Sequence, residues 1–293
     1  MKKLLAILII IIPVLVHAQD NKKNTGLEFY ESGKSEYYSG NYDEAADRLK
    51  SAIELDGTNS DYYLWLGKVY LAKLDESSFF EKGILSGKVM DNYQKAIKIN
   101  PANIEARIHL ANYYIYAPSI AGGSTKKAKE QAEEINKYAP EQALMLYANI
   151  YSQEGEYNLA IEEYKKYVAL HPEDVDAYYQ FGMFYQALER FDDATEMFEM
   201  AIKIDDKAYG SLYQIGRTAI FSGENIDRGI NCLQEYIEVN PGSPNPGLDS
   251  AHWRLGMLYE KKGKMKLARK EYSIAADLNP DEIKYKEALE KIS

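Results

Sequence analysis

The side chains in this chain that could do chemistry are widely scattered. Beyond residue 18 the histidines are His109, His171 and His252, and none forms a recognisable metal motif with a ligand four residues away. Cys232 is the only cysteine, so neither an intrachain disulfide nor a zinc–thiolate site can form. It stands in an apolar helical stretch, which predicts a small buried side chain. The sequence therefore predicts neither a metal site nor a cofactor.

Phosphate-binding and nucleophilic motifs are also missing. The run Gly122–Lys127 (GGSTKK) lacks the first glycine and the Gly-Lys-Ser/Thr order of a phosphate loop, and no strand precedes it. Ser124 or Thr125 is expected to cap a helix instead. No Gly-x-Ser-x-Gly elbow occurs. Acidic pairs such as Glu162-Glu163 lie on predicted polar faces, where they are solvated and do not form a glycosidase pair. We expect no enzyme activity.

The elements that must position these residues recur along the chain. A small residue returns at intervals of 34, 44, 37, 34, 34 and 40 residues, at Gly33, Gly67, Ala111, Ala148, Gly182, Gly216 and Gly256. A period of about 34 residues with three insertions is typical of stacked helix–turn–helix units. Such units bury their apolar faces only against one another, so we expect a single elongated domain.

The segment 175–208 is the clearest unit. Its first helix has one apolar face, formed by Tyr178, Phe181, Gly182 and Tyr185, and its second buries Ala194, Phe198 and Ala201. We predict that Gly182 and Ala194 are small because the two helices cross closely there.

These residues resemble the tetratricopeptide repeat family. The pattern of Leu-Gly, Tyr, aromatic, Ala and Pro appears as Leu66-Gly67, Tyr70, Tyr93, Ala96 and Pro101, and again as Leu255-Gly256, Tyr259, Tyr272, Ala275 and Pro280. The resemblance implies an all-α, right-handed α-solenoid of about seven helix–turn–helix units, with residues 283–293 as a C-terminal capping helix. The units are expected at about 26–59, 60–103, 104–140, 141–174, 175–208, 209–248 and 249–282. They leave no segment long enough for a catalytic domain.

The first eighteen residues have the pattern of a secretory signal. Two lysines precede the apolar run Leu4–Val16, and small residues at positions 16 and 18 favour cleavage before Gln19. The alternative is a permanent anchor, but a run of about thirteen residues is shorter than the roughly 20 needed to span a bilayer. Residue 19 is not a lipidation cysteine. We expect a periplasmic or secreted protein with no stable membrane anchor after cleavage, and a polar linker over 19–25.

The chain is acidic, with 35 Lys and Arg against 45 Asp and Glu and a net charge of −10. Removing residues 1–18 takes away two lysines and makes the charge −12. Nucleic-acid binding requires clustered basic side chains, so nucleic acid is not an expected partner.

The resemblance also implies a binding groove, lined by the fifth and ninth residues of each first helix. The fifth positions are Tyr30, Leu64, Ile108, Met145, Tyr179, Tyr213 and Trp253. The ninth positions are Lys34, Lys68, Asn112, Asn149, Met183, Arg217 and Met257. Aromatic anchors, amides for a peptide backbone and cations for carboxylates suit a peptide partner. The alternative is that part of the fifth-position row belongs to the core.

Some family members grip a chaperone's terminal carboxylate with a clamp that includes lysines. This chain has Tyr30, Ile108 and Met145 where clamp lysines would be required. We therefore expect a non-enzymatic protein–protein interaction scaffold of the bacterial cell envelope that binds another peptide or a partner helix in its groove. The alternative is a structural assembly factor of an envelope machinery, bound through its convex face or its ends; carbohydrate binding ranks third.

Three insertions interrupt the period, at 73–88, 117–124 and 241–248. The first holds Phe79, Phe80, Ile84 and Leu85, and we predict that these residues lengthen the helices of their unit and pack on each other. The alternative is an exposed docking knob. The third insertion is rich in proline and glycine, which predicts a stiff connector.

Overall fold

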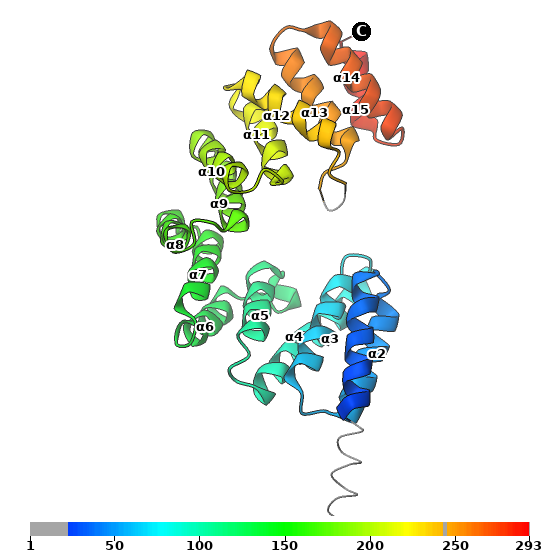
Figure 1. The fold of residues 1–293 in the computed structure, drawn as a ribbon, viewed down its shortest axis with the longest axis vertical. Helices are drawn as coiled ribbons and strands as arrows, with labels where there is room; N and C mark the ends of the chain where they lie inside the picture. The colour runs from blue at the N-terminus through cyan, green and yellow to red at the C-terminus, as the bar shows by residue number, and fades with distance from the viewer. Residues whose placement is uncertain (1–22, 243–244, 293) are drawn as a thin grey trace, which may run out of the picture. The chain divides into compact units, whose positions relative to one another are not determined.

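The computed structural model describes residues 23–242 and 245–292, and over these ranges every regular element is a helix (Figure 1). The predicted signal segment 1–18 and its cleavage before Gln19 lie outside the described residues. The chain is already helical at Lys23, inside the segment expected as a linker. Two compact units divide the chain, residues 1–163 and 164–293, and each is treated by itself below.

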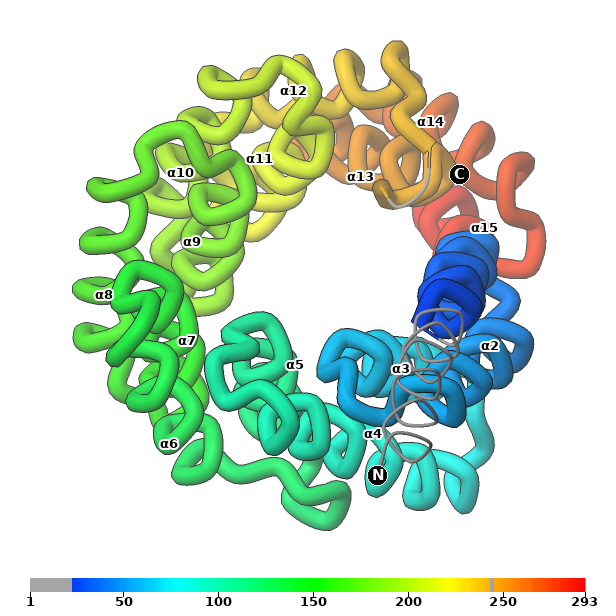
Figure 2. The backbone as a smooth tube through the Cα atoms, turned by 60° about the horizontal axis from the view of Figure 1, so that its bottom comes forward, coloured from blue at the N-terminus to red at the C-terminus, as the bar shows by residue number. Residues whose placement is uncertain are grey.

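Helices follow one another in pairs within each unit (Figure 2). The first unit contains a helix over residues 23–38, then α2 (Tyr42–Leu55), α3 (Ser60–Lys73), α4 (Phe79–Ile99), α5 (Ile104–Tyr116), the short 3-10 helix η1 (Ser119–Ala121), α6 (Thr125–Asn136) and α7 (Pro140–Glu154). Helix α8 (Tyr157–Leu170) contains the division between the units. The second unit continues with α9 (Val175–Ala187), α10 (Phe191–Ile204), α11 (Tyr209–Ser222), α12 (Ile226–Val239), α13 (Leu248–Lys261), α14 (Met265–Leu278) and α15 (Ile283–Lys291).

The predicted fold class is confirmed. The described residues form seven helix pairs followed by the single terminal helix α15, and the helices of a pair pack on each other, as α3 does on α4 and α13 on α14. First helices of consecutive pairs also touch, α5 with α7 and α11 with α13. Because each helix buries its apolar side against its neighbours in the stack, the core runs along the row of pairs.

Several first helices begin with the same polar cap. The side chains of Asn103 and Asp174 stand just before α5 and α9 and accept hydrogen bonds from backbone N–H groups of the first turn, at 2.9 and 3.0 Å. Asn59 does the same for α3 at 3.0 Å. An amide or carboxylate oxygen satisfies donors that have no partner within the helix, and this fixes where each unit starts.

A glycine lets the two helices of a pair approach closely. A β-carbon built on Gly67 would lie 2.6 Å from the ring of Tyr93. The corresponding distances are 2.6 Å from Gly182 to Phe198 and 2.5 Å from Gly256 to the ring of Tyr272. Carbon atoms cannot approach so closely, so any larger residue would push the second helix away. The prediction that Gly182 is small for this reason is confirmed.

The first insertion lengthens α4 to 21 residues, but α3 keeps 14, the same length as α2, so the prediction that both helices lengthen is confirmed only for α4. The prediction that its apolar residues pack on each other is confirmed for Phe79 and Phe80, whose ring centroids lie 6.0 Å apart, but three of the four residues remain exposed, as the alternative of a docking knob requires. Leu85 is buried, but Phe79, Phe80 and Ile84 are 81%, 85% and 63% exposed. They lie on the first two turns of α4.

The second insertion forms η1 and a left-handed glycine, Gly122, with φ of 96°. The side chain of Ser124 then accepts a hydrogen bond from the N–H of Lys127 at 3.3 Å, which confirms that this glycine-rich run caps a helix. The third insertion includes residues 243 and 244, which lie outside the described residues. Beside them, the hydroxyl of Tyr236 donates a hydrogen bond to the carbonyl of Pro246 at 2.5 Å.

Candidate protein-binding surface

The fifth-position residues are mostly half-buried. Tyr30, Ile108, Met145, Tyr179 and Trp253 each keep part of their surface exposed. Leu64 and Tyr213 are different, because only 1% and 4% of their surface remains exposed. These two side chains therefore support the helices around them and offer almost no surface to a partner.

Side chains of this row also contact the first helix of the next repeat. In the second unit, the hydroxyl of Tyr179 accepts a hydrogen bond from the side-chain amide of Gln214 at 3.2 Å. The hydroxyl of Tyr213 accepts one from Nε of Arg254 at 2.6 Å. In both cases the fifth residue of one first helix meets the sixth residue of the next. The fifth-position residues thus connect consecutive repeats and also border the exposed surface.

The ninth-position residues all keep part of their surface exposed. Two of the three cations among them already have carboxylate partners. Lys34 pairs with Glu31 at 3.2 Å, and Lys68 pairs with Glu105 on the next first helix. Arg217 has no such partner among the described residues. Its guanidinium lies 5.1 Å from the ring centre of Phe221.

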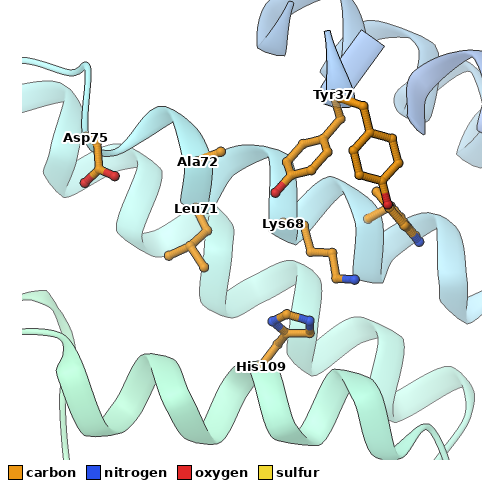
Figure 3. Close-up of a pocket in the computed structure, with 8 residues that line it drawn as sticks. Tyr37, Lys68, Leu71, Ala72, Asp75 and His109 are labelled. Atoms are coloured by element: carbon orange, nitrogen blue, oxygen red, sulfur yellow. The ribbon is translucent and has the colours of Figure 1, made fainter. Parts of the chain in front are cut away.

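A pocket of about 340 Å³ opens on the first helices of the first three repeats, all within the first unit (Figure 3). Its walls come from the helix over 23–38, from α3 and its C-terminal end, and from α5. The lining residues are Tyr37, Tyr38, Trp65, Lys68, Leu71, Ala72, Asp75 and His109. A hollow on this face is what the predicted groove requires.

Trp65 lines this pocket together with two other aromatic side chains. The rings of Tyr37 and Tyr38 meet it edge-on, with centroids 5.6 and 5.7 Å away. Such edge-to-face contacts fix the ring planes and keep their apolar surfaces available. Only Lys68 of these lining residues was predicted from the sequence. Trp65 holds the sixth position of its helix, which is next to the expected row, and the neighbouring Tyr37-Tyr38 pair was the signal that could have located the pocket.

Charge is distributed unevenly over the pocket. The ammonium of Lys68 lies 4.4 Å from the ring centre of Trp65, and the ammonium of Lys34 lies 5.2 Å from it. Cations at these distances are attracted by the aromatic face. Asp75 lies away from them along α3, as Figure 3 shows. A bound segment therefore meets cations beside the tryptophan and a carboxylate further along.

His109 contributes a neutral ring to the pocket. It stacks on Tyr93 with ring centres 5.6 Å apart, and its Nε2 lies 3.7 Å from a carboxylate oxygen of Glu105. Burial lowers the pKa of His109, and the nearby Lys68 lowers it further, against the opposing effect of Glu105. At neutral pH the imidazole is uncharged and can donate or accept a hydrogen bond.

The second unit presents a cationic and aromatic surface at the equivalent place. The guanidinium of Arg254 lies 5.2 Å from the ring centres of both Tyr213 and Trp253. The ammonium of Lys284 lies 5.1 Å from the ring centre of Trp253 and forms an ion pair with Glu282. Neither Arg254 nor Arg217 forms an ion pair with a carboxylate of the described residues. In an acidic protein, two such guanidinium groups beside aromatic rings suit a partner's carboxylate.

A second hollow of about 310 Å³ lies in the first unit between α4, α5 and α6. Tyr114, Lys127 and Gln131 are among its lining residues, together with Arg107, which is held by the carbonyl of Pro101 at 3.0 Å and by Gln131 at 2.9 Å. Second helices form two of its three walls. It is therefore distinct from the aromatic pocket.

Histidine, cysteine and carboxylate side chains are spread over the described part of the chain. No cluster of three His, Cys, Asp or Glu side chains that could hold a metal occurs there. Cys232 is buried as predicted, and burial raises the pKa of its thiol to about 12. His252 and Glu271 lie 2.6 Å apart and link α13 to α14. None of the described helices combines the length and apolar character needed to cross a membrane.

Comparison with known families agrees with this architecture. A family model described as TPR repeat matches residues 33–73, and two described as tetratricopeptide repeat match 151–215 and 213–283, together more than half of the chain. The chain belongs to the tetratricopeptide repeat family. Repeats of this kind are generally non-catalytic and mediate protein–protein interactions, which supports an interaction scaffold.

Individual relatives are distant. The chain is 22% identical to the BBSome complex member BBS4 of Bos taurus over 250 residues, covering 73% of this chain and 45% of that protein. It is 29% identical over 146 residues to anaphase-promoting complex subunit 3 of Schizosaccharomyces pombe, covering 50% of this chain and 21% of the relative. The chain thus spans less than half the length of these curated relatives.

The solved structure of a tetratricopeptide repeat protein from Parabacteroides merdae is similar in fold. Its TM-score is 0.55 at 15% identity, with 92% of this chain and 99% of that chain covered.

Proposed function

We propose that this protein is a non-enzymatic scaffold of the bacterial cell envelope that holds an extended partner segment on the face formed by its first helices. The observation that carries the proposal is the aromatic pocket around Trp65, which combines apolar walls with Lys68 and Asp75 at different places. Buried aromatic anchors contribute much of the affinity at protein interfaces. The segment we expect carries an apolar side chain for this pocket.

Carboxylates on the partner would suit the second unit. Arg217 and Arg254 lie on the first helices α11 and α13, beside exposed surface of Trp253 and Met257. Because the two guanidinium groups have no carboxylate partner among the described residues, a partner's Asp, Glu or C-terminus would not have to displace an existing ion pair.

The test compares exposed side chains on different faces. Tyr38 is 74% exposed in the pocket wall, whereas Tyr138, just after α6, is 64% exposed away from the pocket. Truncating either residue to alanine removes similar surface and little core. We expect Tyr38→Ala and Arg217→Gln/Arg254→Gln to reduce capture of envelope partners by the purified protein, and Tyr138→Ala to leave it unchanged. Partners would be quantified by mass spectrometry against the unaltered protein.

Retention of every partner by the first-helix variants would refute the groove proposal. It would favour the alternative, a structural assembly factor of an envelope machinery bound through its convex face or its ends. Two observations favour that alternative: the second hollow lined by Lys127 and Gln131, and the names of both curated relatives, which describe members of larger complexes. Loss of partners in Lys127→Glu would then be the positive result. A glycan array tests the third-ranked interpretation, carbohydrate binding.

Envelope localisation is part of the proposal, and its support is the pattern of residues 1–18. The test is cell fractionation followed by N-terminal sequencing of the mature protein, with Gln19 as the expected first residue. Recovery from the cytoplasm with residue 1 or 2 intact would refute it. The proposal includes neither nucleic acid nor a stable membrane anchor as partner.

A further inference from the structure

A buried guanidinium in the first unit has only neutral partners. Arg107, near the start of α5, keeps 8% of its surface exposed. Its Nε donates a hydrogen bond to the carbonyl of Pro101 at 3.0 Å, and its Nη1 donates one to Oε1 of Gln131 at 2.9 Å. Arg107 forms no ion pair with a carboxylate of the described residues. Charges removed from water are normally paired with an opposite charge, so this arginine is suited to an anion from outside the chain.

The end of this side chain lies at the wall of the second hollow, the one of about 310 Å³ between α4, α5 and α6. Both members of the Arg107–Gln131 hydrogen bond line the hollow. Only two of the guanidinium N–H groups are used by Pro101 and Gln131, so the others can donate to a ligand there. The planar guanidinium matches the two oxygens of a carboxylate.

A second cation borders the same hollow. Lys127, in the first turn of α6, is exposed and forms no ion pair with another described residue. Its ammonium lies 5.5 Å from the ring centre of Tyr114. The hydroxyl of Tyr114 accepts a hydrogen bond from the side-chain amide of Gln94 at 3.0 Å, which holds the ring between α4 and α5. An anion in the hollow is therefore attracted by Lys127 as well as by Arg107.

Two carboxylates of α6 stand near these cations. Glu134 pairs with Lys137 at 2.5 Å. Glu130 lines the hollow, is exposed and forms no ion pair among the described residues. Because Glu130 repels an anion, it should weaken the binding of a carboxylate and does not compete with it for Arg107.

The remaining wall of the hollow includes apolar surface. Leu110 is 2% exposed, and Ile97 is half-buried. Ligand sites have volumes of about 300–1,000 Å³, so this hollow is at the small end of the range and suits a short segment. Such a segment carries a carboxylate next to an apolar side chain.

We propose that the hollow between α4, α5 and α6 binds the carboxylate of a peptide, held by the guanidinium of Arg107 and the ammonium of Lys127, with Ile97 beside the peptide's apolar side chain. Second helices form two of the three walls, and none of the residues that line the aromatic pocket lines this hollow. The site therefore goes beyond the groove on the first helices and does not depend on it.

NMR titration of the purified protein with three acetylated peptides tests the proposal. The first is Ala-Ala-Leu with a free C-terminal carboxylate, the second is the same peptide as its neutral C-terminal amide, and the third is Ala-Glu-Leu amide, whose only carboxylate is a side chain. We expect an acidic peptide to bind at millimolar concentration and to shift the Nε–H resonance of Arg107, whereas the neutral amide does neither. The comparison of the two acidic peptides identifies whether the carboxylate is that of a chain end or of a side chain.

Neighbouring residues of α6 provide matched controls. Lys127→Glu should weaken acidic-peptide binding at least about threefold, because it replaces an attraction by a repulsion. Lys126→Glu makes the same change at an exposed lysine outside the hollow and should have little effect. Glu130→Gln should strengthen binding, whereas Glu133→Gln, also outside the hollow, should not. Arg107→Lys keeps the charge but loses the planar fork, and should weaken binding at least about tenfold.

Circular dichroism checks that each variant is folded, and the α6 variants keep the test decisive if Arg107→Lys is not. The proposal is overturned if neither acidic peptide binds at millimolar concentration, if the neutral amide binds as tightly as the acidic peptides, or if Lys126→Glu and Lys127→Glu weaken binding equally. Tyr38→Ala, in the aromatic pocket, should bind the acidic peptide as the unaltered protein does. Loss of carboxylate binding and loss of partner capture on the first helices are therefore separate results.

Discussion

Alanine substitution at two glycines of the α3–α4 pair should have opposite effects on stability. Gly67 lies in α3, where a β-carbon would meet Tyr93 at 2.6 and 2.7 Å. Gly87 lies in α4, where a β-carbon would find nothing within 4 Å. Both positions are inside α-helices of the same pair. The chemical change is identical, so the difference between the two variants isolates the cost of the close approach.

The magnitude follows from two contributions. Replacing glycine by alanine inside a helix stabilises by about 0.8–1.0 kcal/mol at either position. Forcing an extra carbon into a packed core costs about 1–3 kcal/mol. Tyr93 cannot easily move aside, because it is 0% exposed and stacks on His109. We therefore expect Gly87→Ala to be more stable than the unaltered protein and to exceed Gly67→Ala by about 1–3 kcal/mol.

Thermal unfolding followed by circular dichroism provides the assay. At about 2–4 °C per kcal/mol for a domain of this size, the two midpoints should differ by about 2–12 °C. Gly256→Ala repeats the test in the second unit, where a β-carbon on the glycine would lie 2.5 Å from the ring of Tyr272. If Gly67→Ala and Gly87→Ala raise the midpoint equally, the glycine–aromatic approach does not determine the spacing of the helices, and the reasoning fails.

Three further predictions concern single groups. The pKa of His109 is lowered in the folded protein, so the imidazole binds a proton more readily in the unfolded chain. The neutral, buried His109 therefore contributes its full stability above the unfolded pKa, and this contribution is lost as the pH falls below that value. Between pH 7.5 and 5.5 the melting midpoint should fall more for the unaltered protein than for His109→Gln. Cys232, with its pKa raised to about 12 by burial, should resist iodoacetamide in the folded protein and react after denaturation; rapid native alkylation would contradict its placement. Burial alone would raise the pKa of Asp249, but hydrogen bonds from Asn279 and from Tyr285 at 2.9 Å leave this pKa lowered. Asp249→Asn should therefore release α15 and increase its hydrogen exchange at neutral pH, but have little effect below the folded pKa of Asp249. Equal protection of α15 in both proteins at neutral pH would count against this link.

Much of the fold could be predicted from the sequence because each determinant is local. Gly182 and Phe198 belong to the same unit and lie 16 positions apart, so one repeat contains both partners of the close approach. Ser124 and the residue whose N–H it accepts are three positions apart. Repetition of such local patterns seven times was sufficient to determine the class of fold, its helix pairs and the terminal helix.

The candidate site could be predicted only in part because exposure depends on neighbouring units. The repeat places Tyr179 and Tyr213 at equivalent positions, yet only Tyr213 is almost fully buried: its hydroxyl meets both Ser250 and Arg254 of the next repeat, whereas that of Tyr179 meets Gln214. Trp65 stands one position outside the expected row, and its pocket forms only because three consecutive first helices bring Tyr38 and His109 beside it.

The sequence by itself determined the period, the helix pairs, the caps and the close glycine contacts, because these depend on residues within one repeat. Only the tertiary structure decided which of the equivalent side chains face solvent. It buried Leu64 and left Phe79 and Phe80 exposed, although all three are large and apolar. The physical reason is that burial is set by the surface of the adjacent unit, and where an insertion extends α4 beyond its neighbours, no such surface is present to cover it.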